Sequence, residues 1–380
     1  MKRILVSPLS IGLGHATRVL PIVRHLLGRG HEVTIAATGR AMALLRRESG
    51  ACEFLQRKDY PSPFSRTRYF LPRFVAMIPA LQGAVSAEGR RLVRLLERRR
   101  FDLLLSDSRY GIRSPDVPSL ILTHGLRFVE PRGLRRAYAA GHRWLARLEF
   151  LTEIHTSRVL PRFDRVLVPD FADPERNLSG RCAHGLTRLP MDNVYYAGPL
   201  TSIRRLDVPE DVDVFITVSG PEPQRTELER IVLGQVERLP GRRIVVALGK
   251  PEVKEVRRLN SRITVYGYLD RRPQQEMLNR ARLVVCRSGY TTIMELAELG
   301  KKALFIPTPG QPEQEVLAEH HRQRGFFHAV SQYDLDLARE VEAARATPGF
   351  PVRFDTAANV RRLYEEVLGP ILDGGGPAAP

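Results

Sequence analysis

A histidine in a glycine-containing loop is the first candidate for chemistry in this sequence. His15 follows Gly12 and Gly14 in the stretch Ser10–Arg18, just before a helix predicted at 17–27. An unperturbed imidazole titrates at a pKa of about 6.5, so it can accept a proton from a hydroxyl group at neutral pH. We therefore predict that His15 is a general base, with a helix-capping or loop-bracing role as the alternative.

An aspartate at the end of a later strand is placed to assist this histidine. Asp107 directly follows the strand predicted at 102–106. The carboxyl ends of parallel strands share the sheet edge at which α/β proteins bind ligands, so Asp107 is predicted to lie on the same edge as His15. A carboxylate there would hold the imidazole in the tautomer that a base needs. A loop-capping role for Asp107 is the alternative.

The glycines of the first loop also allow a ligand to approach the backbone. Gly12 and Gly14 would admit a phosphate or a sugar hydroxyl, and the helix that follows favours negative charge at its start. The dinucleotide fingerprint is not matched, because its third glycine is absent and no acidic residue ends the strand predicted at 32–36. NAD binding is therefore disfavoured.

A second group of candidate residues surrounds a Ser-Gly turn in the other half of the chain. Ser288 and Gly289 stand between a strand predicted at 283–286 and a helix start, where free backbone N–H groups form a cradle for an anion. Glu295, further along that helix, is placed for hydrogen bonds to two ribose hydroxyls; the alternative is a partner for the helix dipole. A proline- and glutamine-containing loop at 307–314 completes the group.

Two alternating series of elements must position these residues. Short β-branched runs alternate with amphipathic stretches of helical period, which is typical of βαβ units around a parallel sheet. We predict an α/β chain with one domain at 1–200, a second at 201–370 and a disordered tail at 371–380. The turn-forming stretch Gly198–Ser202 marks the boundary. Strands are predicted at 4–7, 32–36, 102–106, 119–123, 165–168, 214–218, 243–247, 263–266, 283–286 and 303–306, a long helix at 134–160, and a last amphipathic segment at 356–368.

The positive charge of the chain is concentrated in its first half. The formal net charge is +17; residues 1–200 hold 33 Lys and Arg against 17 Asp and Glu, and residues 201–380 hold 26 against 25. This asymmetry predicts that the first domain faces something anionic: phospholipid headgroups, a pyrophosphate-linked lipid or nucleic acid. An arginine-rich composition without a partner is the alternative.

Composition excludes several other classes of protein. With 43% hydrophobic and 27% charged residues, the chain has the composition of a globular protein. No apolar run approaches the ~18 residues that are needed to cross a bilayer. No secretion signal follows Met1, so a cytoplasmic location is expected. The three cysteines, Cys52, Cys182 and Cys286, are scattered without metal-site spacing and are expected to be reduced thiols.

One segment of the first domain has the composition of a membrane-surface element. Residues 66–79 mix arginines with aromatic and aliphatic residues, and residues 90–100 add further positive charge. This composition suits a segment that lies on anionic lipid, with an amphipathic element that covers the core as the alternative. Nucleic acid is not favoured as a partner, because no RNA-binding signature accompanies the arginines.

The second group of candidate residues resembles that of a known family. It is similar to the GT-B glycosyltransferases related to the N-acetylglucosaminyltransferase of the lipid-linked peptidoglycan precursor and to diacylglycerol glycosyltransferases. The resemblance covers nearly the whole chain and is strongest in the second domain. It implies two Rossmann-like domains that face each other across a cleft, a UDP-sugar donor, and an acceptor that is lipid-linked or at the membrane surface.

The resemblance also implies roles for individual residues. The donor sugar and ribose would be contacted by the Arg-Ser-Gly turn, its helix and the proline loop, the uracil by Tyr268 and Leu269, and the donor phosphates by the loop at 219–225, where Arg225 would neutralise charge as UDP leaves. The implied donor-binding positions are Gly12, Gly14, Ser219, Gly220, Pro221, Gln224, Arg225, Tyr268, Leu269, Arg287, Ser288, Gly289, Thr292, Glu295, Pro307, Gln311, Glu313 and Gln314.

The mechanism implied is an inverting displacement in which His15 is the base and neither a metal nor a cofactor takes part. Asp211 and Asp213 match the letters of an Asp-x-Asp metal site, but they precede their strand and are interpreted as a solvated loop. Pro221 and Pro223 stand where the family is glycine-rich, a departure that bears on the acceptor more than on the donor. A UDP-sugar 2-epimerase of the same fold, a non-catalytic sugar-nucleotide sensor, and transfer to a soluble acceptor are the alternatives.

Overall fold

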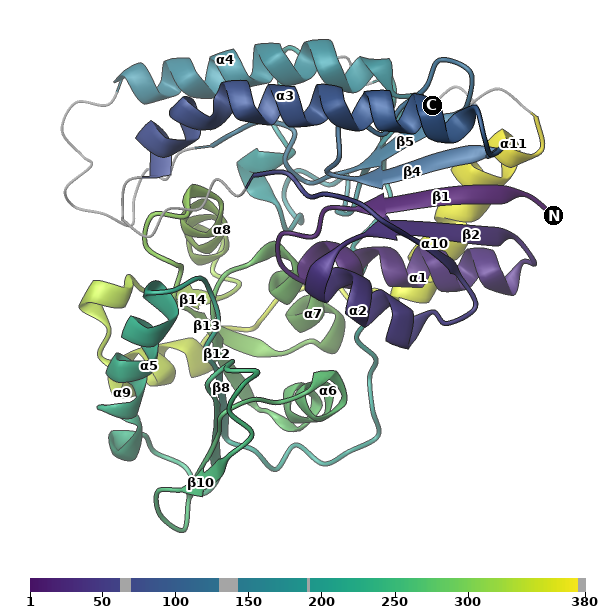
Figure 1. Cartoon of the computed structure of the whole chain (residues 1–380). Helices are drawn as coiled ribbons and strands as arrows, with labels where there is room; N and C mark the ends of the chain where they lie inside the picture. Colours follow the sequence, from purple (N-terminus) through teal and green to yellow (C-terminus); the bar gives the residue numbers. More distant parts are fainter. Residues whose placement is uncertain (62–69, 130–142, 190–191, 375–380) are drawn as a thin grey trace.

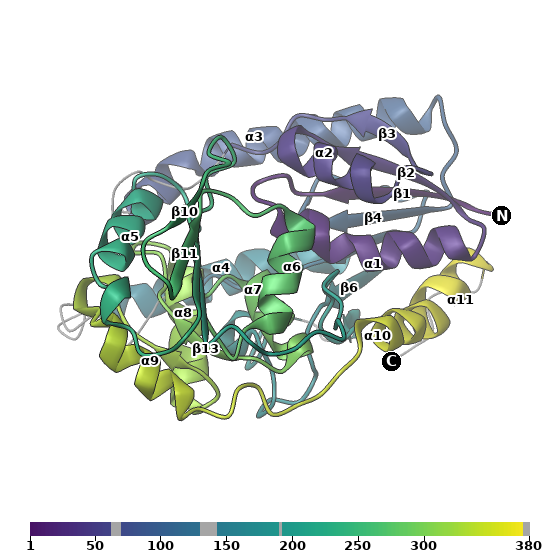
Figure 2. The ribbon, with the colours of Figure 1, turned by 90° about the horizontal axis from the view of Figure 1, so that it is seen from below.

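Two α/β units, each built on its own sheet, make up the protein (Figure 1, Figure 2). The computed structural model describes residues 1–61, 70–129, 143–189 and 192–374, and at 70–75 and 143–148 it describes the backbone alone. The predicted fold class, two Rossmann-like units, is confirmed by these two sheets and the helices that flank them.

The first unit contains a parallel sheet of seven strands in the order β3-β2-β1-β4-β5-β6-β7. Its central strands are runs of leucine, isoleucine and valine, which suits a sheet that helices cover on both faces. Ile4 and Val6 pack in one core cluster and Leu5 in another, because side chains alternate between the faces of a strand. The strands are β1 Arg3–Pro8, β2 Glu32–Ala37, β3 Glu53–Gln56, β4 Leu103–Asp107, β5 Ser119–Leu122, β6 Arg165–Val168 and β7 Val194–Tyr196.

Helices cover both faces of the first sheet. In Figure 1, α1 (Gly14–Gly28) and α2 (Gly39–Glu48) lie on one side of it, and α3 (Phe70–Leu96) and α4 (Arg143–Val159) lie on the other.

The membrane-surface segment predicted at 66–79 lies partly in α3, a long helix that the sequence did not predict. Residues 66–69 lie outside the described residues, as do residues 134–142 of the helix predicted at 134–160.

The second unit also contains a seven-stranded sheet, in the order β10-β11-β9-β8-β12-β13-β14. All of its neighbouring strands are parallel except β10, which pairs antiparallel with β11. The strands are β8 Val214–Thr217, β9 Ile244–Ala247, β10 Val256–Arg258, β11 Ile263–Tyr266, β12 Leu283–Cys286, β13 Lys302–Phe305 and β14 His328–Ala329. The helices of this unit are α5 Gln224–Leu233, α6 Arg271–Arg280, α7 Tyr290–Leu299, α8 Pro312–Gln323 and α9 Leu337–Arg345.

The end of the chain returns to the first unit. Helix α10 (Thr356–Leu363), a π-helical turn (Tyr364–Leu368) and α11 (Gly369–Leu372) lie beside α1 in both views (Figure 1, Figure 2). Leu363, Leu368 and other apolar side chains of this stretch join the buried cluster that contains strand β1. The sequence assigned residues up to 370 to the second domain, so the structure corrects that assignment for residues 356–370.

The predicted tail also begins too early. Ile371 and Leu372 are buried, because their apolar side chains complete the core of the first unit. Residues 375–380 lie outside the described residues.

Candidate active site

His15 and Asp107 meet at the carboxyl edge of the first sheet. His15 is the second residue of α1, Asp107 is the last residue of β4, and β1 and β4 are paired neighbours. His15 Nδ1 lies 2.8 Å from Asp107 Oδ1. Because an ionised carboxylate can only accept, Nδ1 carries the hydrogen and donates it. The lone pair of His15 therefore resides on Nε2, the nitrogen that is left to accept a proton.

Arg18 is a member of this cluster that the sequence did not predict. It lies one turn after His15 on α1, and its buried guanidinium donates from Nε to Asp107 Oδ2 over 2.9 Å and from Nη2 to Asp107 Oδ1. Burial by itself would raise the pKa of Asp107, but the charges of Arg18 and His15 outweigh it and hold that pKa well below its usual range. Asp107 therefore stays ionised, and Arg18 balances its charge.

His124 extends the cluster toward the second unit. It follows β5, and its Nδ1 lies 3.0 Å from Arg18 Nη1. Since arginine only donates, Nδ1 accepts and the hydrogen of His124 sits on Nε2, which lies 3.3 Å from Glu313 Oε1. The imidazole also stacks on Tyr290, with ring centroids 4.0 Å apart. Polar contacts thus run from Asp107 to a predicted donor-sugar residue.

The glycine loop abuts the helix of the second unit that carries Glu295. A Cβ placed on Gly14 would lie 2.5 Å from Thr291 Oγ1, at the start of α7. Gly12 has space around it but a φ of +83°, a conformation that favours glycine. Gly14 is therefore required for close contact between the units, and Gly12 for the shape of the loop.

The predicted anion cradle lies at the start of α7. Gly289 precedes the helix without a side-chain cap, so the first backbone N–H groups of α7 remain for a ligand. The Ser288 hydroxyl instead donates to the carbonyl of Gln314 over 2.7 Å. Gln314 accepts from the Thr308 N–H and donates to Gln311 Oε1, so these two glutamines shape the loop after β13, which begins with the buried Pro307.

Arg287 holds the loops of the donor side together. Its buried guanidinium donates to the carbonyls of residues 219, 224, 306 and 307 and to the side chain of Gln332. Burial lowers its pKa to about 9. All five of these acceptors are protein oxygens, so Arg287 is placed to position the loops after β8 and β13 and is not placed to reach a ligand.

Arg225, predicted to neutralise phosphate charge, is engaged with protein groups in this structure. Its guanidinium is buried and forms ion pairs with Glu222 and, over 2.8 Å, with Glu229, and it also donates to the carbonyl of Leu248. These contacts anchor α5 and leave the guanidinium committed to protein groups. Ser219 and Gly220 are exposed in the loop after β8; Pro221 of that loop and Gln224, the first residue of α5, are partly buried.

Glu295 has the environment of a ligand-binding carboxylate. Burial raises its pKa to about 7, although the charge of Arg271 opposes that rise. It forms no hydrogen bond or ion pair with any residue that the structure describes. Thr292, one turn earlier on α7, is partly buried, and the segment with Tyr268 and the buried Leu269 leads from β11 into α6. A partly desolvated carboxylate without a protein partner can accept hydrogen bonds from ligand hydroxyls.

The Asp-x-Asp pair lies at the opposite edge of the second sheet, before β8. Asp211 pairs with Arg280 over 2.7 Å and with Arg243, and Asp213 pairs with Arg282 over 3.0 Å. Both carboxylates are thus occupied by arginines. Within the described residues no three His, Cys, Asp or Glu side chains gather as a metal site.

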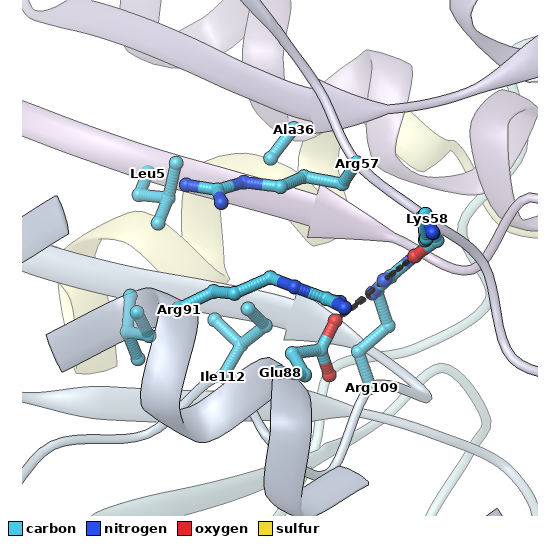
Figure 3. Close-up of a pocket in the computed structure, with 9 residues that line it drawn as sticks. Leu5, Ala36, Arg57, Lys58, Glu88, Arg91, Arg109 and Ile112 are labelled. Atoms are coloured by element: carbon cyan, nitrogen blue, oxygen red, sulfur yellow. Dashed lines mark hydrogen bonds and ion pairs between the residues drawn. The ribbon is translucent and has the colours of Figure 1, made fainter. Parts of the chain in front are cut away.

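A second cluster of charged residues lies between α3 and the first sheet (Figure 3). Buried Arg109 donates to Glu88 Oε1 over 2.7 Å and to the carbonyl of Lys58 over 2.7 Å. Arg57 and Arg91 line the same cavity, whose volume is about 10 Å³. This is room for about one water, so the cluster anchors the loop after β3 and does not hold a substrate.

Residues 216–351 match the glycosyltransferase family 28 C-terminal domain. This range contains the α7 helix, the loops joined by Arg287 and the proline loop. A solved structure described as the glycotransferase of kitacinnamycin has a TM-score of 0.64 and 17% sequence identity, and the match covers 98% of this chain and 95% of that one. The fold is therefore the GT-B fold. The chain is a glycosyltransferase.

Related sequences agree with this assignment. An uncharacterised glycosyltransferase of Methanosarcina acetivorans is 23% identical over 94% of this chain and 96% of its own length. The UDP-N-acetylglucosamine--N-acetylmuramyl-(pentapeptide) pyrophosphoryl-undecaprenol N-acetylglucosamine transferase of Haemophilus influenzae is 27% identical over 43% of this chain and 44% of its own length. The similarity of this GT-B glycosyltransferase to the second relative is thus confined to part of the chain.

Proposed function

We propose that this glycosyltransferase moves a hexose from a UDP-sugar to a hydroxyl group of an acceptor, with inversion at the anomeric carbon and without a metal ion or cofactor. The observation that carries the proposal is the pairing of His15 with ionised Asp107 next to the uncapped start of α7. A base and an anion cradle thus lie on the two sides of one contact between the units.

The reaction follows from these two groups. Nε2 of His15 accepts the proton of the acceptor hydroxyl, and the oxygen forms a bond to the anomeric carbon on the face opposite UDP. The bond between that carbon and the UDP oxygen breaks, and UDP leaves with the electron pair. The N–H groups at the start of α7 stabilise the phosphate charge that develops, a role that the positive end of the helix dipole supports.

The donor would lie along the carboxyl edge of the second sheet. Glu295 accepts hydrogen bonds from the ribose hydroxyls, Tyr268 and Leu269 contact the uracil, and Gln311, Glu313 and Gln314 border the sugar. Glu313 is 54% exposed and lies beside His124, so a donor sugar held there would be close to the Asp107 cluster. Since Arg225 is paired with protein carboxylates, backbone N–H groups would stabilise the phosphate charge instead.

We further propose that the acceptor is lipid-linked or at the inner membrane surface, where the chain would bind peripherally. Ile78 and Val93 of α3 and Leu151 of α4 are exposed, and α3 also exposes Arg90 and Arg94. Exposed aliphatic residues among arginines suit anionic lipid. Among the described residues, no helix has the length and apolarity to pass through a bilayer.

Incubation of the purified chain with a panel of UDP-sugars, with and without bacterial lipid extract, tests the proposal. UDP release that needs both a UDP-sugar and the extract, with a glycosylated lipid as product, is the expected result. Conversion of one UDP-sugar to its 2-epimer without UDP release would favour the epimerase. Binding without turnover would favour a sensor.

A further inference from the structure

A large pocket lies where the chain crosses between the two units, away from the donor side. Its volume is about 620 Å³, and its walls come from α1, the segment Thr201–Arg205, the end of α7 and the start of α10. This volume is typical of pockets that hold small molecules. None of the residues predicted to bind the donor lines it, so the transfer reaction does not account for it.

The walls of this hinge pocket carry more positive than negative charge. Four arginines line it against two carboxylates: Arg24, Arg204, Arg205 and Arg361, against Glu298 and Asp355. Both carboxylates already accept hydrogen bonds, Glu298 from Thr356 and Asp355 from the first backbone N–H groups of α10. The field inside the pocket therefore favours an anion.

Three of the polar groups in the walls lack a partner. The guanidinium groups of Arg204 and Arg361 form no hydrogen bond or ion pair with any residue that the structure describes. His25 Nε2 is buried and likewise has no hydrogen-bond partner among those residues. Buried polar atoms are nearly always hydrogen-bonded in folded proteins, so the unpaired imidazole nitrogen indicates room for a further partner in this wall. Arg204 and Arg361 line the same pocket and are exposed, so their guanidinium groups remain available to a ligand with several acceptor oxygens.

The two unpaired arginines belong to different units. The backbone of Arg204 is fixed to α6 of the second unit, because its N–H donates to Gln275 Oε1 over 2.9 Å and its carbonyl accepts from Asn279 Nδ2 over 3.0 Å. Arg361 is carried by α10, which packs into the core of the first unit through Leu363. An anion bound by both arginines would connect the units directly.

We propose that the hinge pocket binds a small soluble molecule that carries phosphate groups, held between Arg204 and Arg361, and that the bound molecule ties the two units together. The site is independent of the donor site, so it can be occupied while UDP is bound. If the pocket binds no such molecule, the proposed transferase function is unaffected.

Calorimetric titration of the full chain with inorganic pyrophosphate, in the presence of saturating UDP, tests this proposal. UDP occupies the donor phosphate site, so the heat reports a second site. We expect the wild type to bind pyrophosphate and the Arg204→Ala and Arg361→Ala variants to bind it about tenfold more weakly or worse, because each loses charge-assisted hydrogen bonds.

Arg362→Ala is the matched control, since it removes the same charge from the next position on α10 without changing the pocket lining. This variant should bind pyrophosphate with the wild-type affinity. Wild-type affinity in both Arg204→Ala and Arg361→Ala, an equal loss in Arg362→Ala, or no binding once UDP is present would each overturn the proposal. Circular dichroism melting of the variants shows whether they remain folded.

Discussion

Asp107 accepts hydrogen bonds from both Arg18 and His15, and this determines which ring nitrogen of His15 carries the hydrogen. Arg18 Nη2 lies 3.0 Å from the same His15 Nδ1 that contacts Asp107. Arg18 and a hydrogen on Nδ1 cannot both donate across that contact, so the carboxylate decides the tautomer. The arrangement leaves the lone pair on Nε2 and keeps the buried charges of Arg18 and Asp107 balanced.

Glu295 should make the stability of the protein depend on pH. Burial raises its pKa to about 7 from 4.5, so between these values the folded state holds a proton that the unfolded state has released. Its contribution to the free energy of unfolding therefore falls as pH rises from about 4.5 to about 7. Glu295→Gln should remove this loss and be more stable than the wild type at pH 8, by the order of 1–3 kcal/mol, but not at pH 4.5.

Urea denaturation of both proteins at pH 4.5 and pH 8 measures this difference. A difference in unfolding free energy that does not change with pH would contradict the environment assigned to Glu295. The same variant should bind UDP more weakly at pH 8, because an amide cannot accept from two ribose hydroxyls as a carboxylate does.

The sequence predicted His15 and Asp107 of this cluster. It missed Arg18 and His124, although the position of each in the sequence pointed to the cluster. Asp107 was placed by its position at the end of a strand, and His124 follows β5 at the same edge, so the same argument would have found it. Arg18 is three residues from His15 and thus shares a helix face with it. What the sequence could not reveal is that both Arg18 and Arg225 are buried. The fold brings Asp107 to Arg18 from 89 residues away, whereas Glu222 and Glu229 lie within about one helical turn of Arg225.

At the scale of elements, Arg287 is the residue that joins the loops of the donor side. Arg287→Lys should lower the free energy of unfolding by about 2–4 kcal/mol, because one ammonium group cannot donate hydrogen bonds to all five acceptors that the guanidinium reaches. UDP affinity should fall with it, since the loops after β8 and β13 lose their common anchor. Urea denaturation and UDP titration measure the two effects.

Arg282→Lys is the control for this change. Arg282 is 62% exposed and pairs with Asp213, so its replacement should alter stability by less than about 0.5 kcal/mol. Equal effects of the two substitutions would show that Arg287 does not anchor the loops.

The predictability of the elements followed their hydrophobic pattern. The buried strands of both sheets were found because short continuous runs of valine, leucine and isoleucine are typical of strands that are covered on both faces. Helix α3 was missed because Pro79 interrupts it and arginines and aromatics obscure its period. The apolar face of 356–368 was visible in the sequence, but a periodic face does not say which core it joins, and here it joins that of the first unit.

At the scale of the whole molecule, the contact between Gly14 and Thr291 sets how closely the units approach. Gly14→Ala would place a Cβ 2.5 Å from Thr291 Oγ1, so the glycine loop and α7 must move apart. We expect at least a tenfold loss of turnover, because the base and the anion cradle then separate. Thr291→Ala in the same chain should restore most of the loss by removing the hydroxyl.

Gly28→Ala, at the end of α1, is the matched control, because a Cβ there would meet no atom within 4 Å. Its turnover should equal that of the wild type. A Gly14→Ala variant with full turnover, or one that Thr291→Ala does not rescue, would show that this contact does not position the site.

The most direct test of the central claim is acceptor-dependent UDP release by the wild type and the His15→Ala variant, with the donor and lipid extract that support turnover. His155→Ala, which removes an exposed histidine of α4, is the control. We expect His15→Ala to lose turnover by a factor of about 100 or more while it still binds UDP, and His155→Ala to keep wild-type turnover. Undiminished UDP release by His15→Ala would contradict the assignment of His15 as the base.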